Sequence, residues 1–330
     1  MELSEVIRMK DKEILWVKEL ETLKKPVREL NGAELSYTTS LISYFEKKIA
    51  DSSLVWFPRC LDRKIEHRIE TMNITVPNDI QGELVQELKL PLHCLRSFAT
   101  DRDHLFVSDY LRPLHIFRKS DWNLVVCSPE DTNFDEIAVD NDNVYTAHQF
   151  HAQVRIFRRS DLKLISSFGS YGNSPGQFKG SRQICLDDKH IFVCDTENHR
   201  IQMFRKSDHT FVRQFGSHGN GLGQLRKPWN IAVDGEDVFI VDKFNHRIQV
   251  FNKSDGKFIQ SYYGFSYPSS VAIIGDQLFI SSKRKVHVIN RFDASFVRSF
   301  GEFDEIASLR LHYDGTNLYV MDLHSIKIFC

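Results

Sequence analysis

One block of the sequence recurs almost unchanged further along the chain. Residues 191–204 read IFVCDTENHRIQMF, and residues 238–251 read VFIVDKFNHRIQVF. The two copies begin about 47 residues apart, and a fixed period of this size is typical of solenoids, propellers and other repeat arrays. The chain must therefore fold largely as repeated units. We expect function on a face of the repeated scaffold and not at a single catalytic motif.

Four weaker copies of the same block extend the repeat to six units. They lie at residues 105–117, 144–157, 278–288 and 318–329. Neighbouring units are roughly 39 to 47 residues apart, a spacing that suits the four-stranded blades of a propeller.

Each complete unit reads as four short strands. In the clearest unit the predicted strands are residues 231–233, 238–241, 247–251 and 258–262, separated by turns at 234–235, 245–246 and 253–256. These turns contain Asp-Gly or Asn, which tolerate the positive φ of tight hairpins. No unit contains a helical period long enough for a crossover helix. The sequence therefore predicts an all-β, six-bladed β-propeller.

The sequence also predicts how the ring closes. The last unit ends at its third strand, residues 326–329, so its fourth strand is missing. An orphan segment before the first unit, residues 82–88, matches the fourth strand at 256–262. We expect a strand near 82–90 to complete the last blade and remove two exposed sheet edges, which would otherwise be templates for aggregation.

The recurring motif resembles a known family. The pattern Asp-x-x-Asn-His-Arg-Ile-Gln-x-Phe at 195–204 and 242–251 is similar to the NHL repeat, and the resemblance extends over roughly 91–330. It implies an NHL-like six-bladed propeller that recognises partners, often within ubiquitin-ligase chains. Two units depart from the motif, with His148 and Ser282 in place of the Asp. The chain has no Cys/His array for a zinc RING domain, so that route to ligase activity is closed.

Residues 1–78 differ in character from the propeller region at 79–330. Their apolar residues roughly follow helical spacing, as at Leu3, Val6, Ile7 and Ile14 and again at Leu41, Ile42, Phe45 and Ile49. This spacing predicts a short α-helical N-terminal segment. Two interpretations stay open: a small helical cap that packs on the propeller or on itself, and a segment for oligomerisation or partner binding.

Composition narrows the class of protein. The formal net charge is -1 and 26% of residues are charged, which argues against DNA or a membrane surface as the partner. No apolar run approaches the ~18 residues of a membrane span. The six Cys show no metal-ligand spacing. We expect a cytoplasmic protein with reduced thiols, without a cofactor or metal, that is not an enzyme.

Several patterns could carry chemistry, but each has a structural interpretation that we favour. The glycine-rich run at 219–223 could cradle a phosphate, but no helix follows it, so we interpret it as a turn. The recurring Asn-His-Arg at 198–200 and 245–247 could present catalytic imidazoles; we predict turn geometry and hydrogen bonds between blades instead. The Asp residues that end the second strands, such as Asp195 and Asp242, are interpreted as caps of the adjacent turn.

One propeller face is the candidate binding site. The connections from strand 4 to strand 1 and the turns from strand 2 to strand 3 share this face, and aromatic residues alternate there with Arg and Lys: Tyr110, Arg112, Phe150, His151, Lys179, Arg182, Arg226, Lys227, Trp229, Lys243, Phe244 and Arg247. The opposite face carries a second basic ring, which we interpret as a solubility feature: Arg118-Lys119, Arg158-Arg159, Arg205-Lys206 and Lys253.

Three functions fit these observations. The leading prediction is a non-enzymatic interaction scaffold that binds a protein or peptide on the candidate face. The alternative is a propeller that binds single-stranded RNA, since aromatic side chains beside Arg and Lys can stack on bases and neutralise phosphates. A second alternative is a metal-dependent lyase or lactonase that uses the central channel, with His93, His148 and His151 as ligands.

Overall fold

The computed structural model describes residues 82–88, 90, 95–109, 114–128, 136–148, 151–303, 309–322 and 325–330. All of them belong to the second of two units into which the chain divides, Met1–Leu61 and Asp62–Cys330. The helical segment predicted at 1–78 lies outside the described residues. Within the described part, no helix is long and apolar enough to cross a membrane.

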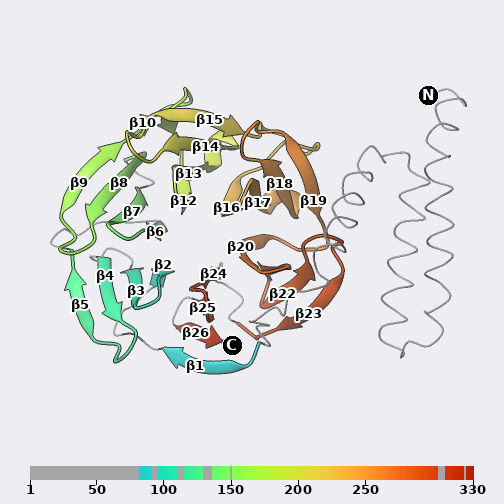
Figure 1. Cartoon of the computed structure of the whole chain (residues 1–330). Coiled ribbons are helices and arrows are strands. Elements are labelled where there is room, and N and C mark those ends of the chain that lie inside the picture. Colours follow the sequence, from blue (N-terminus) through green and yellow to red (C-terminus); the bar gives the residue numbers. More distant parts are fainter. Residues whose placement is uncertain are drawn as a thin grey trace, which may run out of the picture. The chain divides into compact units, whose positions relative to one another are not determined.

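Six four-stranded antiparallel sheets form a ring, as the repeat predicts (Figure 1). Blade 1 consists of β2 (Leu95–Thr100), β3 (His104–Asp109), β4 (Leu114–Arg118) and β5 (Leu124–Cys127). Blade 2 consists of β6 (Glu136–Val139), β7 (Asn143–His148), β8 (Gln153–Arg158) and β9 (Leu164–Phe168). Blade 3 consists of β12 (Ser181–Leu186), β13 (His190–Asp195), β14 (Arg200–Arg205) and β15 (Phe211–Phe215).

The second half of the ring repeats this order. Blade 4 consists of β16 (Pro228–Asp234), β17 (Asp237–Asp242), β18 (Arg247–Asn252) and β19 (Phe258–Tyr262). Blade 5 consists of β20 (Pro268–Ile274), β21 (Gln277–Ser282), β22 (Lys285–Asn290) and β23 (Phe296–Phe300). Blade 6 combines β24 (Arg310–Tyr313), β25 (Leu318–Met321) and β26 (Ile326–Phe329) with β1 (Leu84–Leu88). Smaller elements are β10 (Ser170–Tyr171), β11 (Gln177–Phe178), η3 (Thr196–Asn198) and η4 (Lys243–Asn245).

The orphan segment closes the ring at blade 6. β1 pairs antiparallel with β26 and is the outermost strand of that sheet, so the cyan β1 lies beside the red β26 in Figure 1. The backbone N–H of Gly82 donates to the carbonyl of Cys330 (3.0 Å), and the N–H of Cys330 donates to the carbonyl of Glu83 (3.2 Å). Leu88 is buried at the end of β1. The N-terminal and C-terminal parts of the propeller are thereby joined in one sheet.

The hydrophobic core is divided among the blade interfaces. Side chains on alternate positions of a strand face opposite neighbours, so strands 2 and 3 of each blade are apolar on both faces. At the interface of blades 4 and 5, Phe239 and Val241 of β17 pack with Leu278 and Ile280 of β21. Equivalent clusters fill the other five interfaces. Each blade is therefore stabilised mainly by its neighbours.

The basic ring on the face opposite the candidate site pairs with acidic residues, which corrects the interpretation as a solubility feature. The residue that follows strand 3 contacts an Asp at the strand 1–2 turn of the preceding blade. Five interfaces carry such a pair: Lys119–Asp314, Arg159–Asp101, Lys206–Asp140, Lys253–Asp187 and Arg291–Asp234. In contrast, Arg118, Arg158 and Arg205 pair with the Asp of their own turn.

These pairs stabilise the ionised carboxylates. Burial alone would raise the pKa values of Asp140 and Asp187, but hydrogen bonds from Lys206, Lys253 and backbone N–H groups outweigh it and lower both values. A carboxyl with a lowered pKa stabilises the fold above its unfolded value and loses that contribution as the pH falls through the folded value. The ion pairs between blades on this face thus connect adjacent blades at neutral pH.

A second polar ring lines the centre of the propeller. The same position of the innermost strand is polar in every blade: Ser97, Glu136, Gln183, Asn230, Ser270 and Arg310. Oδ1 of Asn230 accepts the backbone N–H of Val271 in the next blade (3.1 Å), and Ser97 and Ser270 make the same bond to their next blades. At these three interfaces the inner strands are therefore connected side chain to backbone.

Arg310 reaches from blade 6 to two other blades. Its Nε donates to the carbonyl of Arg96 in blade 1 (3.1 Å), and it forms an ion pair with the buried Glu136 of blade 2. The amide nitrogen of Gln183 in blade 3 donates to the same carboxylate (2.9 Å). Burial lowers the pKa of Arg310 to about 9, so the guanidinium stays charged at neutral pH. Converging side chains thus occupy the central channel at this level.

We expect the buried imidazole of His312 to make stability pH-dependent. Burial lowers the pKa of His312 to about 4, and the charge of Lys119 acts in the same direction, against Asp314 and Asp101. Because the unfolded imidazole titrates near 6.5, the unfolded state binds the extra proton between these values. The free energy of unfolding is therefore unaffected by protonation of His312 above about pH 6.5. It should be lower by roughly 3 kcal/mol at pH 4. Denaturant unfolding of wild type and His312→Phe at pH 7 and 4.5 tests this. Equal losses in the two proteins would contradict it.

Candidate binding face

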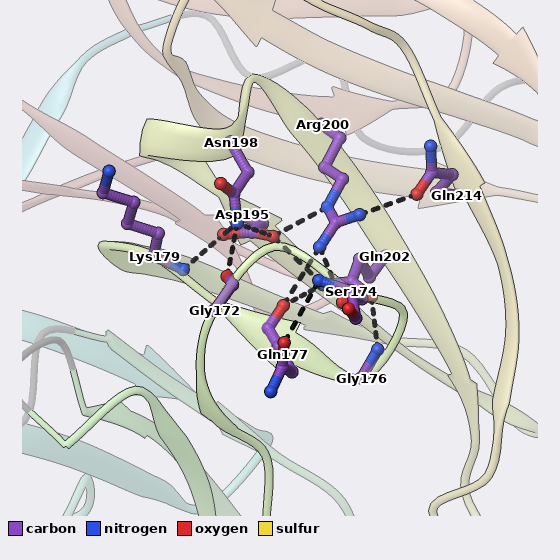
Figure 2. A network of polar contacts seen from close by, with 10 residues as sticks. All are labelled: Gly172, Ser174, Gly176, Gln177, Lys179, Asp195, Asn198, Arg200, Gln202 and Gln214. Carbon is purple, nitrogen blue, oxygen red and sulfur yellow. Dashed lines mark hydrogen bonds and ion pairs between the residues drawn. The ribbon is translucent and has the colours of Figure 1, made fainter.

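The recurring motif forms a buried polar network in blade 3 (Figure 2). Asp195 ends β13 and is fully buried. Its carboxylate accepts hydrogen bonds from the backbone N–H of Lys179 (2.7 Å), the amide of Asn198, Nε of Arg200 (2.8 Å) and Nε2 of Gln202 (3.0 Å). Asp195 thus joins the turn after β13, the strand β14 and the connection from blade 2 in one network.

The same side chains fasten the long connection from blade 2 to blade 3. Nη2 of Arg200 donates to the carbonyl of Ser174 (2.9 Å) and Nε2 of Gln202 donates to that of Gln177 (2.6 Å). Oε1 of Gln202 accepts the N–H of Gly176 (2.9 Å), so the amide of Gln202 both donates to the connection and accepts from it. The connection is therefore bound along its length to the blade it leads into.

Blade 4 repeats this network around Asp242. Nε of Arg247 donates to Asp242 (2.7 Å), and Nη2 donates to the carbonyls of Gly221 and Gln224 (2.7 and 2.8 Å). The glycine-rich run at 219–223 is thus a turn that offers carbonyl groups to Arg247. We predicted Arg247 as a residue of the partner face, and the structure corrects this placement. Arg247 is only 3% exposed because its guanidinium is consumed by Asp242 and the connection.

The histidine of each motif binds the residue that precedes the inner strand of the next blade. This residue has an unusual backbone conformation. Nδ1 of His199 accepts the backbone N–H of Lys227 (3.0 Å), and Nδ1 of His246 accepts that of Tyr267 (3.1 Å). These are hydrogen bonds between blades. Lys227 and Tyr267 both have positive φ (54° and 52°), which is costly for a residue with a large side chain. The scaffold thus fixes two side chains at the same position of successive interfaces.

The structure gathers aromatic residues around Tyr267. We call Trp229, Lys243, Phe244, His246 and Tyr267 the aromatic cluster. Nζ of Lys243 lies 3.6 Å from the centre of the Trp229 ring, which is a close cation–π contact. The Tyr267 ring lies 4.2 Å from that of His246 and 6.0 Å from that of Phe244, nearly perpendicular to both. Tyr267 is 53% exposed and Phe244 is 36% exposed, so the cluster combines a rigid backbone with open apolar surface.

The remaining predicted site residues are dispersed. Arg226 is exposed, and its backbone N–H donates to Asp242 (2.7 Å). Lys179 is exposed at the equivalent place in blade 3, where its N–H donates to Asp195 (2.7 Å). Lys227 pairs with Glu197 (3.0 Å). The structure gives Arg182 a place in β12, without a description of its side chain. Tyr110, Arg112 and Phe150 lie outside the described residues.

Sequence reasoning missed Tyr267 and the role of His246 as its partner. The signal was present: Lys227-Pro228 and Tyr267-Pro268 both stand directly before an inner strand. A residue before proline avoids the right-handed helical region, so a repeated X-Pro pair marks a special backbone position. Alignment of the units on this pair would have placed Tyr267 on the face.

The described residues do not bring together a metal site. No group of three or more His, Cys, Asp or Glu that could hold an ion occurs among them. His148 ends β7, His151 follows in the turn, and His93 lies outside the described residues.

Comparisons with known proteins agree with the fold. A family described as a 6-bladed beta-propeller matches residues 176–306, which is less than half of the chain. The crystal structure of the computationally designed Ika8 protein is similar over 71% of this chain and 70% of that chain, with a TM-score of 0.50 and 9% sequence identity. At this identity the likeness concerns the fold alone. No curated protein matches the chain.

Proposed function

We propose that this propeller is a non-enzymatic scaffold that binds a segment of a partner protein at the aromatic cluster. The NHL-like motif belongs to the same proposal, because partner recognition is what that resemblance implies. The observation that carries it is Tyr267, a largely exposed aromatic residue fixed with positive φ by His246. Strained backbone is retained where the surroundings over-determine it, and it concentrates at binding sites.

The cluster has the composition of an interaction hot spot. Trp and Tyr are enriched among the residues that dominate binding energies, since they bury large areas at a small entropic cost. Here Phe244 of blade 4 meets Tyr267 at the start of blade 5, and the half-buried Trp229 packs against the core of the same interface. The polar motif residues beneath them are satisfied internally and hold the surface rigid, which reduces the ordering cost of binding.

Loss of the two exposed rings should abolish partner capture. We expect the full-length variant Phe244→Ala/Tyr267→Ala to lose at least about 30-fold in affinity, because a hot-spot residue contributes about 2 kcal/mol or more. The backbone N–H of residue 267 that donates to His246 is retained in this variant. The measurement is capture of proteins from native lysate, with and without nuclease treatment.

The matched control is Phe296→Ala. Phe296 is 42% exposed, between the values of Phe244 (36%) and Tyr267 (53%), but it lies on the outer strand β23. Proteins captured by wild type and by the control, but not by the double variant, would support the proposal. The same proteins captured by all three would refute it, and loss of capture after nuclease treatment would favour RNA.

A further inference from the structure

The charge around the aromatic cluster is one-sided. Lys283, Arg284 and Lys285 form an exposed basic turn in blade 5. This turn adjoins the cluster because the hydroxyl of Ser282 donates to the carbonyl of Ser266 (2.8 Å), the residue before Tyr267.

Among the described residues, the acidic groups near the cluster are Asp242, Glu197 and Glu302. Asp242 is buried and committed to Arg247, and Glu197 is paired with Lys227 (3.0 Å). Glu302 precedes Phe303, whose carbonyl accepts Nε of Arg284 (2.7 Å), so this carboxylate lies beside the basic turn. At the position of Asp242, blade 5 carries Ser282. Three cations against Glu302 leave the basic turn positive in a chain whose formal net charge is only -1. Complementary charge guides association and suppresses partners of the wrong sign.

The ring geometry favours a peptide over nucleic acid. Bases stack on open ring faces. One face of Trp229 is covered by Lys243 at 3.6 Å, and the rings of Phe244 and Tyr267 are inclined at 85° to each other. Two perpendicular rings form a corner that fits an aliphatic or aromatic side chain. The cations of the adjacent turn 283–285 then suit carboxylates next to that side chain in the partner.

We infer that the partner segment is an acidic stretch of a protein, with a large apolar side chain packed into the corner formed by Phe244 and Tyr267 and carboxylates against the basic turn 283–285. This inference rests on the proposed function and specifies the chemistry of its ligand.

Selection from a displayed random-peptide library on the full-length protein tests the inference. We expect the enriched peptides to carry an excess of Asp and Glu around one large apolar residue. Binding of a synthetic enriched peptide should fall about tenfold or more with Lys283→Glu/Lys285→Glu, because two attractive charges become repulsive. Lys163→Glu/Lys257→Glu changes the net charge equally on the exposed turns from strand 3 to strand 4, and should leave binding within about twofold.

The outcomes separate this inference from the proposed function. Enriched peptides that are neutral or basic, but whose binding depends on Tyr267, would contradict the inference of an acidic ligand and still support the proposed binding site. Enrichment that is indifferent to Phe244→Ala/Tyr267→Ala would overturn both. If the wild type binds oligouridine and Phe244→Ala/Tyr267→Ala does not, the ligand of the site is RNA and the inference of a peptide is wrong. Equal losses in the two Lys→Glu variants would mean that only the overall charge matters, and would also overturn the inference.

Discussion

Asp242→Ala should destabilise the propeller by about 3–5 kcal/mol, the usual cost of removing one partner from a buried ion pair. Asp242 is fully buried and Arg247 is 3% exposed, so the substitution leaves the guanidinium without its counter-charge. The amide of Gln249 and the backbone N–H of Arg226 lose an acceptor at the same time. Chemical denaturation at pH 7 measures the loss.

The control for this prediction is Asp255→Ala. Asp255 also pairs with a basic residue, Lys257 (3.1 Å), but both side chains are largely exposed (44% and 75%). An exposed pair contributes little to stability, because solvent screens the charges. Similar losses in the two variants would show that the Asp242 network does not hold the connection 216–227 onto blade 4.

Removal of β1 should have a comparable or larger effect. Deletion of residues 1–90 removes the outer strand of blade 6, its pairing with β26 and the buried side chain of Leu88. Loss of a buried Leu alone costs about 2–5 kcal/mol, and the newly exposed edge of β26 becomes a template for association. We expect a lower melting temperature and a tendency to aggregate.

Deletion of residues 1–75 is the matched comparison, because it retains β1. Its melting temperature should stay close to that of the full-length chain. If thermal unfolding and light scattering are the same for the two truncations, ring closure by β1 does not contribute to stability.

The sequence by itself determined the repeat and the fold. Two near-identical blocks and their turn residues predicted four strands per unit, and the match between 82–88 and 256–262 predicted the strand that joins both parts of the chain. These inferences succeed because strand alternation and turn chemistry are local properties of the chain. The recurrence of Asp195 and Asp242 at one position of the repeat also indicated a structural role, since a repeated position reflects the repeated scaffold.

Only the tertiary structure decided which repeated side chains reach the solvent. Arg247 was predicted on the surface, but it is buried because the connection bends back over its own blade and contacts residues 23 and 26 positions away. Lys253 looked like a solubility residue, but it pairs with Asp187, 66 positions earlier in the chain. Tyr267 drew no prediction, because its exposure depends on the bond to His246 across a blade interface. Such contacts join residues of different blades or distant loops, so packing decides them and local pattern does not.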